Sequence, residues 1–296
     1  MPSTKCMCCP RMCGIDRSLN YGFCKSNNNI KIAKAYLHQW EEPCLSKKNG
    51  AGTVFFSGCN LRCVYCQNYK ISNQNFGKTI SVDRLAEIFI ELQDKGASNI
   101  ELVTPTHYVL QILKALDKVK NRLVVPVVYN CGGYELPDII KMLNGYIDVY
   151  LPDIKYFSDT FAARYSSAAD YFSYASESVK EMTSQCGKLS FDADGSIIKG
   201  TIIRHLVLPG LRKDSMNIIK WIADNLPADS YLLSLMSQYT PTPFVAEHFP
   251  ELNRRITKME YFSVLNYAAD LGINGFSQSK TSAVSDYTPD FDLSGV

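Results

Sequence analysis

The chain has 296 residues, 46% of them hydrophobic, and its 31 basic residues nearly balance its 29 acidic residues. This length can bury a large core, while the net charge of only +2 argues against a surface dedicated to nucleic acid. No run is apolar enough to span a membrane, and the N-terminus lacks the apolar stretch of a secretion signal, so we expect a cytoplasmic protein.

The eleven cysteines are concentrated towards the N-terminus, which in a cytoplasmic protein favours metal binding over disulfides. Four of them have a spacing that can close a four-thiolate site for zinc or for an iron–sulfur cluster. These four are Cys6, Cys9, Cys13 and Cys24, and Cys8 or Cys44 can replace one of them. Because the segment contains few apolar residues, we expect a metal to organise it. The alternative is a set of free thiols on a flexible arm.

The first predicted strand after this region covers residues 52–57 and leads into a loop with three more cysteines. Cys59, Cys63 and Cys66 have the spacing C-x3-C-x2-C. Three thiolates can hold a [4Fe–4S] cluster and leave its fourth iron open to a ligand, as a catalytic site requires. Tyr65 directly precedes the last cysteine, where its ring can shield the cluster. A zinc knuckle is the alternative.

Alternating strand and helix patterns follow the cysteine loop. Further strands are predicted at residues 99–104, 123–129, 146–151, 202–208 and 231–236, with a short one at 274–277. Helices are predicted at residues 82–95, 108–120, 136–143, 161–186, 216–225 and 255–271. About six strand–helix units indicate a parallel sheet with right-handed crossovers, but they are too few for a closed eight-stranded barrel.

We therefore predict an α/β fold, a partial (β/α)6 TIM-like barrel, over residues 49–279. A cysteine-rich N-terminal extension would cover residues 1–48, and a loosely held tail would cover residues 280–296. A flat, doubly wound parallel sheet is the alternative, because periodicity does not separate it from an open barrel.

Polar residues follow the predicted strands, at the edge where α/β proteins place their active sites. Asp153 and Lys155 are two residues apart, so they share one face of an extended chain. Opposite charges on one face suit a zwitterionic ligand, whereas the simpler alternative is a structural ion pair. His205 lies in an apolar strand, where a lone histidine is most often a hydrogen-bonded core residue.

Several motifs along the chain resemble the radical S-adenosylmethionine (SAM) superfamily, whose members carry a CxxxCxxC loop after the first barrel strand. Besides the cysteine loop they are Cys6-x2-Cys9-Pro-Arg-x-Cys13-Gly14, Trp40-Glu-Glu-Pro-Cys44, Thr104-Pro-Thr-His-Tyr108, Tyr150-Leu-Pro-Asp-Ile-Lys155, Arg204-His-Leu-Val-Leu-Pro-Gly210 and Ser237-Gln-Tyr-Thr-Pro241. Together they are similar to a branch of proteins like the activating enzyme of pyruvate formate-lyase, over nearly the whole chain. The resemblance implies the partial barrel, a [4Fe–4S] cluster and bound SAM.

The resemblance also implies which residues contact the cofactor. Activating enzymes of glycyl radical proteins carry an Asp-x-Lys on strand four and a histidine on strand five, which correspond here to Asp153, Lys155 and His205. They also carry an asparagine two residues after the third cluster cysteine, which corresponds to Asn68. An acidic residue at the end of their third strand corresponds less closely to Asn130.

One departure from that pattern follows the second strand. The activating enzymes have a Gly-Gly-Glu turn that holds the ammonium group of SAM, and this chain has Thr104-Pro-Thr-His107 instead. Backbone carbonyls can still accept hydrogen bonds there, but the carboxylate is missing. Thr106 and His107 are therefore candidates for contacts with the cofactor or the substrate.

For function, the resemblance implies that flavodoxin or ferredoxin reduces the cluster, which then cleaves SAM to methionine and a 5′-deoxyadenosyl radical. The radical would abstract hydrogen from a glycyl radical protein, with this chain as its activase, or alternatively from a small molecule or peptide. A non-catalytic iron–sulfur or zinc protein is a further alternative. It explains the cysteines but not Asp153, Lys155 and His205 at neighbouring strand ends.

Overall fold

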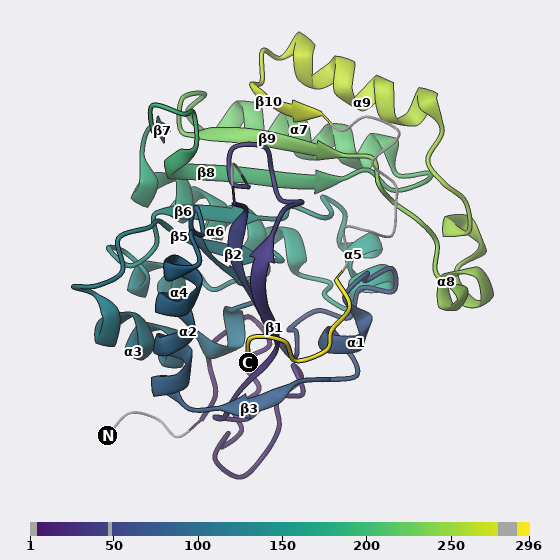
Figure 1. Ribbon diagram of the computed structural model, residues 1–296. Coiled ribbons are helices and arrows are strands. Elements are labelled where there is room, and N and C mark those ends of the chain that lie inside the picture. Colours follow the sequence, from purple (N-terminus) through teal and green to yellow (C-terminus); the bar gives the residue numbers. More distant parts are fainter. Residues whose placement is uncertain (1–4, 47–48, 278–288) are drawn as a thin grey trace.

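The structure, a computed structural model, describes residues 5–46, 49–277 and 289–296. One sheet, with the strand order β10-β9-β8-β6-β5-β4-β2-β1-β3, forms its centre (Figure 1). Neighbours from β2 to β10 are parallel, whereas β1 and β3 are antiparallel additions at one edge. The strands are β1 (Ile30–His38), β2 (Ala51–Phe56), β3 (Lys78–Ile80), β4 (Ile100–Val103), β5 (Val127–Cys131), β6 (Val149–Pro152), β7 (Ser190–Phe191), β8 (Ile197–Leu206), β9 (Tyr231–Met236) and β10 (Gly275–Ser277).

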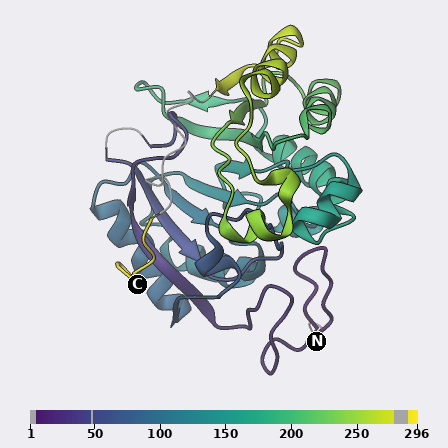
Figure 2. The ribbon, with the colours of Figure 1, turned by 90° about the vertical axis from the view of Figure 1, so that its right-hand side faces the viewer.

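Helices cover the outer side of the sheet, and α2 and α3, α4 and α6, and α7 and α9 pack against each other (Figures 1 and 2). The helices are α1 (Tyr69–Ser72), α2 (Val82–Asp94), α3 (Val109–Val119), α4 (Pro137–Met142), α5 (Asp159–Ser166), α6 (Tyr171–Cys186), α7 (Arg212–Asn225), α8 (Pro243–His248) and α9 (Lys258–Asp270). Two 3₁₀ turns, η1 (Thr106–Tyr108) and η2 (Pro250–Leu252), complete the described elements. In α2, the Ser81 side chain caps the first turn and Leu85, Phe89 and Leu92 form the buried face.

The order of the strands decides between the two predicted architectures. The parallel strands β2, β4, β5, β6, β8 and β9 are neighbours in the same order in which the chain forms them. With right-handed crossovers, an order that never reverses places every helix on one side of the sheet, as in a barrel. A doubly wound sheet requires a reversal. Within the described ranges β3 and β10 remain edge strands, so the barrel is open, and the predicted α/β partial barrel is confirmed.

Three segments differ from the sequence-based expectations. The strand predicted at residues 123–129 begins only at Val127, because Pro126 before it has no N–H to donate to a neighbouring strand. The helix predicted at residues 161–186 is two helices, since Ser167 adopts a left-handed conformation (φ +54°) that ends α5. The strand β1 was not predicted, although Ile30–His38 partly alternates buried and half-buried residues.

The strand β1 also bears on where the N-terminal extension ends. Residues 34–38 of β1 pair with residues 51–55 of β2, so β1 is part of the barrel sheet. The segment before β1 consists of loops that project below the sheet (Figures 1 and 2). We therefore propose that the cysteine-rich extension ends near residue 29 rather than at residue 48.

The end of the chain contacts β1. The predicted loose tail over residues 280–296 lies partly outside the described residues, but the described part, residues 289–296, is attached to β1 by backbone hydrogen bonds and one buried ring. The Ala35 N–H donates to the Ser294 carbonyl (2.9 Å), and the Leu293 N–H donates to the Ala33 carbonyl (3.1 Å). The Phe291 ring is only 5% exposed and lies edge-on to Phe55, with the ring centroids 5.4 Å apart. The last residues thus extend the barrel wall beside β1.

Replacing Phe291 by alanine should therefore destabilise the fold. Removing this buried ring leaves a cavity against Phe55 and should lower the free energy of unfolding by about 3 kcal/mol. Urea unfolding of the full chain measures the change. Phe262→Ala on α9 is the control, because that ring is 46% exposed and its loss should change stability by less than about 1 kcal/mol. Equal stability of Phe291→Ala and wild type would mean that the tail does not pack as described.

Candidate active site

A cavity of about 500 Å³ opens at the C-terminal ends of the parallel strands. The cysteine loop after β2, the ends of β5, β6, β8 and β9, and the segment 38–43 after β1 all contribute to its lining. Its volume lies in the range of small-molecule sites. Of the residues predicted from the sequence, Cys59, Cys63, Cys66, Tyr65, Asn68, Asn130, Asp153 and Lys155 line it.

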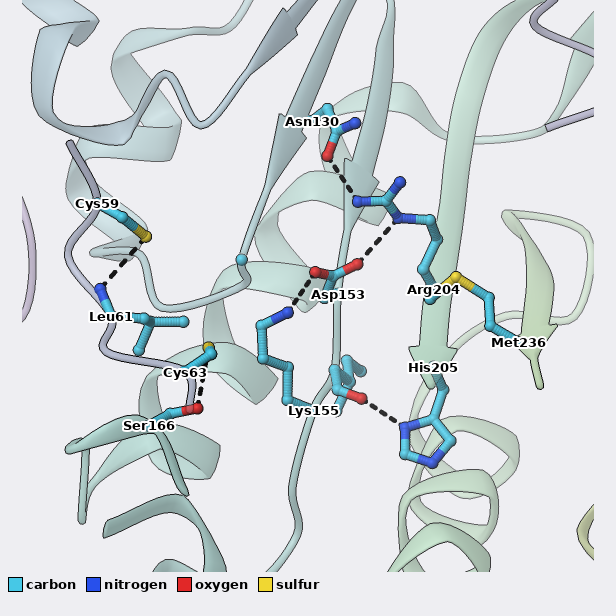
Figure 3. Close-up of polar contacts among 12 residues, drawn as sticks. Cys59, Leu61, Cys63, Asn130, Asp153, Lys155, Ser166, Arg204, His205 and Met236 are labelled. Carbon is cyan, nitrogen blue, oxygen red and sulfur yellow. Dashed lines mark hydrogen bonds and ion pairs between the residues drawn. The ribbon is translucent and has the colours of Figure 1, made fainter. Parts of the chain in front are cut away.

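The cysteine loop is held in place by a glycine and by hydrogen bonds to sulfur. Gly58 adopts φ +90°, and a Cβ there would lie 2.3 Å from the Ser26 hydroxyl oxygen, so a larger residue cannot fit. The Leu61 N–H donates to Cys59 Sγ (3.4 Å), and the Ser166 hydroxyl donates to Cys63 Sγ (3.0 Å) (Figure 3). Cys66 Sγ lies 3.3 Å from the Ser72 hydroxyl.

The three thiols fit a cluster better than a single ion. In the described ranges no three His, Cys, Asp or Glu side chains are close enough to hold one metal ion. Yet Cys59, Cys63 and Cys66 line one cavity, as ligands around a larger iron–sulfur cube should. Burial raises the pKa of Cys66 to about 11 and also raises that of Cys59, and the neighbouring Cys63 adds to both shifts.

Tyr65 and Asn68 occupy the end of the same loop. Tyr65 is 8% exposed, and its hydroxyl lies 2.6 Å from the Tyr156 hydroxyl, which fixes the ring beside the cysteines. Asn68 precedes the short helix α1, and its carbonyl accepts the Ser72 N–H (2.9 Å). Both side chains belong to the cavity lining, as the sequence-based assignment to the cofactor site requires.

A charged network faces the cysteine loop across the cavity (Figure 3). Lys155 Nζ lies 2.5 Å from one carboxylate oxygen of Asp153, and Arg204 Nε lies 2.9 Å from the other. The guanidinium of Arg204 also donates to the side-chain amide oxygen of Asn130 (2.7 Å). Burial alone would raise the pKa of Asp153, but the Arg204 and Lys155 cations outweigh burial and lower it.

Arg204 was not assigned to the site from the sequence. Along β8 alternate side chains face opposite sides of the sheet, so Arg204 and Leu206 line the cavity, whereas His205 does not. His205 Nδ1 lies 2.6 Å from the Ile154 carbonyl oxygen, on the side away from Asp153 (Figure 3). Burial lowers the pKa of His205 to about 4. The pattern of a charged residue within an apolar strand could have indicated Arg204.

Thr106 and His107 are also absent from the cavity lining. The η1 turn buries both, and Thr104, with φ +59°, lines the cavity in their place. His107 Nε2 lies 2.8 Å from the Ser57 carbonyl oxygen, so the imidazole fixes the backbone just before Gly58. The Thr106 hydroxyl donates to the Glu135 carboxyl group (2.6 Å). The structure thus places these two side chains behind the cavity wall.

Glu135 should make the stability of the fold depend on pH. Burial raises the pKa of Glu135 to about 8, against 4.5 for an ordinary glutamate, despite hydrogen bonds from Thr106 and Tyr129. Between these values the unfolded chain binds fewer protons than the folded chain, so the contribution of Glu135 to stability is full below pH 4.5 and decreases as pH rises towards 8.

The Glu135→Gln variant keeps an acceptor for Thr106 but cannot titrate. Between pH 5 and pH 8 the wild type should lose on the order of 4 kcal/mol more stability than this variant. Urea unfolding of both proteins at pH 5, 6, 7 and 8 measures the difference. Parallel pH profiles for the two proteins would contradict the buried, protonated state of Glu135.

The N-terminal cysteines lie together in the loops before β1. A Cβ on Gly22 would be 3.4 Å from Cys24 Sγ and 3.6 Å from Cys13 Sγ, so these two sulfurs are neighbours. The thiols of Cys6 and Cys8 are also neighbours, since each shifts the pKa of the other. Because no described trio has the spacing of ligands around one ion, a metal at Cys6, Cys9, Cys13 and Cys24 stays a prediction.

Two arginines fasten these loops to the cluster loop. Arg62 donates to the carbonyls of Phe23 and Cys59, and Arg11 Nε donates to the Asn60 carbonyl (2.8 Å). Both guanidinium groups also stack on the Phe23 ring, with Arg11 Cζ 3.8 Å from its centroid. The extension is therefore attached directly beside the residues that hold Cys59.

The fold and the site define an open α/β barrel with three cysteines and a charged network around one cavity at its strand ends. The sequence model of the Radical SAM superfamily matches residues 53–222, which is more than half of the chain. The chain belongs to the radical SAM superfamily. Membership implies binding of a [4Fe–4S] cluster and of SAM, and radical SAM enzymes are catalytic. No helix within the described ranges has the length and apolar character needed to cross a membrane.

Three known proteins illustrate the relationship. An uncharacterised protein of Methanocaldococcus jannaschii is 32% identical over 273 residues, 89% of this chain and 74% of that protein. The pyruvate formate-lyase-activating enzyme of Clostridium pasteurianum is 27% identical over 198 residues, 62% of this chain and 73% of the enzyme. The structure of Streptococcus suis SuiB bound to the precursor peptide SuiA matches 75% of this chain with a TM-score of 0.51 and 11% identity. The chain spans about half (46%) of the length of SuiB, and this likeness shows the fold alone.

Proposed function

We propose that the chain is a radical SAM enzyme in which Cys59, Cys63 and Cys66 hold the [4Fe–4S] cluster and the strand ends bind SAM. The observation that carries the proposal is that these three thiols line the same cavity as Asp153 and Lys155. With both groups bound, the cofactors supply a 5′-deoxyadenosyl radical that removes a hydrogen atom from a substrate. The chain's own residues position the cofactor and keep water away.

The charged network provides complementary partners for SAM. The Asp153 carboxylate can accept hydrogen bonds from an ammonium group or a ribose hydroxyl, and the Lys155 ammonium can pair with a carboxylate. Arg204 holds Asp153 in its ionised form from the far side. The carboxamides of Asn68 and Asn130 lie in the same lining and add neutral donors and acceptors.

In this proposal His205, Thr106 and His107 support the site through their neighbours. His205 contacts the backbone of Ile154, between Asp153 and Lys155, and so fixes the separation of the two charges. His107 contacts the backbone of Ser57, next to the turn that begins the cysteine loop. Their contribution is to orient the residues that line the cavity.

The substrate is either a glycyl radical protein or a small molecule or peptide. The segment 39–46, here called the inner loop, favours the second class. Its Cys44 carbonyl accepts the Ile197 N–H of β8 (3.0 Å), and Leu45 packs among residues of β5, β6 and β8, so the loop fills the inside of the open barrel. The cavity beside the cysteines, about 500 Å³, has the size of a small-molecule site, which favours a compact group over a folded polypeptide loop.

The proposal is tested by reconstituting the protein with iron and sulfide without oxygen, reducing it and adding SAM. We expect 5′-deoxyadenosine, measured by chromatography, with flavodoxin or ferredoxin as reductant as well as with dithionite. A well-formed cluster that yields no 5′-deoxyadenosine under any reductant would contradict the proposal and favour a non-catalytic iron–sulfur protein. Radical transfer to a partner with a glycyl radical site, seen by EPR, would favour the activase.

We also propose that Cys6, Cys9, Cys13 and Cys24 bind a second metal, zinc or an iron–sulfur cluster. A backbone N–H group donates to one sulfur of this set, that of Phe23 to Cys13 Sγ (3.5 Å). Such bonds favour the thiolate form, which metal binding requires.

Metal analysis of the purified full chain tests the second site. Cys24→Ser should lose the additional metal and keep the iron of the barrel cluster, whereas Cys186→Ser, far along the chain in α6, should keep both. Because Cys24 lies beside Gly58, a folded variant is verified by its barrel iron. Equal metal content in Cys24→Ser and wild type would exclude Cys24 as a ligand.

A further inference from the structure

The inner end of the cavity has more acidic than basic side chains. Glu41 and Glu42 of the inner loop line the cavity, and Glu101 of β4 lies beneath them, fully buried. The nearest cation is Arg204, 3.7 Å from Glu41, and it also pairs with Asp153. Glu41, Glu42 and Glu101 thus have one guanidinium group near them, and that group already pairs with Asp153.

Glu42 is the carboxyl group with no basic partner at contact distance. It is only 8% exposed and lines the cavity, yet no basic side chain of the described ranges lies within 4 Å of it. The Ser234 hydroxyl of β9 lies near its carboxyl group. Burial raises the pKa of Glu42, and the carboxylates of Asp153 and Glu101 add to the shift, against the lowering effect of Arg204 and Ser234. A buried carboxylate of this kind gains from a cationic partner.

The inner loop holds Glu42 in a fixed position. The Glu42 carbonyl accepts the N–H groups of Leu45 (2.7 Å) and Ser46 (3.2 Å), which forms a tight turn. Asn99 Nδ2 donates to the Leu45 carbonyl (2.8 Å), and Ile197 N–H donates to the Cys44 carbonyl, which ties the turn to two strands of the barrel. A preorganised carboxylate loses little entropy when it binds a ligand.

The acidic end is separate from the cofactor-binding end. Moving inwards from the cysteines, the network runs from Lys155 to Asp153, then to Arg204, and only then to Glu41. Asp153 and Lys155 already match the charges of the methionyl group of SAM. Two ion pairs therefore separate Asp153 from the inner carboxyl groups: Asp153 with Arg204, and Arg204 with Glu41. The inner carboxyl groups can bind a different ligand.

The chemistry of that ligand follows from the number of available carboxyl groups. Glu101 is already hydrogen-bonded and Glu41 lies 3.7 Å from Arg204, so few oxygens remain for a metal ion, which needs several ligands. An ammonium or guanidinium group, with several N–H donors, matches one or two carboxylates. Trp40 lines the cavity next to Glu41, so its fluorescence reports on a ligand that binds there.

Building on the proposed function, we infer that Glu41 and Glu42 bind a cationic group of the substrate, a primary ammonium or a guanidinium, beside Trp40. This group belongs either to a small amine or to a lysine or arginine side chain of a peptide. The hydrogen atom to be removed then lies on the same molecule, nearer to the cysteines.

The test uses the reconstituted full chain with SAM bound, in a Trp221→Phe background that leaves Trp40 as the only tryptophan. Agmatine and the peptide acetyl-Gly-Arg-Gly-amide are titrated as cationic probes, and pentan-1-ol and glutarate serve as neutral and anionic probes. We expect saturable changes of Trp40 fluorescence with a cationic probe alone. Tighter binding of agmatine points to a small amine, and tighter binding of the peptide points to a peptide substrate.

Substitutions locate the site. Glu42→Gln keeps the size of the side chain and should weaken binding of the cationic probe at least about tenfold. Glu247→Gln on α8 removes an exposed carboxylate outside the cavity and should have no effect. SAM affinity, measured by equilibrium dialysis, should be the same in Glu42→Gln and wild type.

Three results would overturn the inference: no saturable binding of either cationic probe, equal binding of pentan-1-ol, or an equal loss of SAM affinity in Glu42→Gln. Formation of 5′-deoxyadenosine is measured in the same preparation without probe. If 5′-deoxyadenosine forms and the probes do not bind, only the inference fails. If a well-formed cluster gives no 5′-deoxyadenosine, the proposed function fails, whatever the probes do.

Discussion

Cys63→Ala should lose the barrel cluster and, with it, all formation of 5′-deoxyadenosine. The Cys63 thiol lines the cavity, and the Ser166 hydroxyl donates to its sulfur from the end of α5. Only Cys59 and Cys66 then remain as ligands, whereas a cluster of this kind is attached to the protein through three of its irons. Iron content and the visible absorption of the reconstituted variant measure cluster loss, and chromatography measures product down to the background of the assay.

The matched control is Cys186→Ala. Cys186 is also a buried thiol, 4% exposed, but it lies at the end of α6, and its sulfur contacts the Asp148 carbonyl instead of the cavity. This variant should keep the iron and the activity of the wild type. Product formation by Cys63→Ala, or equal iron loss in both variants, would show that the loop thiols are not the cluster ligands.

Asp153→Asn should affect both stability and cofactor binding. The substitution keeps the size of the side chain but leaves Lys155 and Arg204 without their shared anion, at side-chain exposures of 19% and 16%. Removing one partner from a buried ion network typically costs about 3 kcal/mol or more of folding free energy. Urea unfolding measures this loss, and equilibrium dialysis should show that SAM binding is lost as well.

The loss of stability in Asp153→Asn should depend on pH. The folded state lowers the pKa of Asp153, so its contribution to stability is present above the ordinary aspartate pKa of 3.8 and is lost as pH falls through the folded value. The difference between wild type and Asp153→Asn should therefore be full at pH 7 and shrink only in acid.

Asp138→Asn is the control for charge removal at the surface. Asp138 pairs with Lys141 at 2.9 Å, but their side chains are 90% and 59% exposed, so water and salt replace the interaction. This variant should unfold at the same urea concentration as the wild type. If Asp153→Asn behaved like Asp138→Asn, the network at the cavity would not be a buried one.

The sequence predicted the parts of this protein that depend on local pattern. Period-two and period-3.6 hydrophobicity locates the six parallel strands and most helices, because each element buries one face. The spacing of Cys59, Cys63 and Cys66 after an apolar strand predicts their common position at the strand ends. Asp153 and Lys155 were predicted to share a face, and both line the cavity.

The residues that were missed depend on contacts between distant segments. Arg204 and Glu101 are charged residues in apolar strands, and their roles follow only when β4 and β8 face the same interior. Glu41 and Glu42 reach the cavity because the inner loop folds back into the barrel, which no local pattern encodes. His205 was assigned by resemblance, but strand alternation directs its neighbour Arg204 into the cavity.

The central claim is that the three-cysteine cluster keeps an open iron to which SAM binds. EPR spectroscopy of the reduced, reconstituted protein with and without SAM tests it most directly, because a new ligand on an iron changes the spectrum of the cluster. The barrel cluster is identified by the signal that Cys63→Ala lacks. We predict that SAM shifts this signal in the wild type. An unchanged spectrum of a fully formed barrel cluster at saturating SAM would contradict the claim.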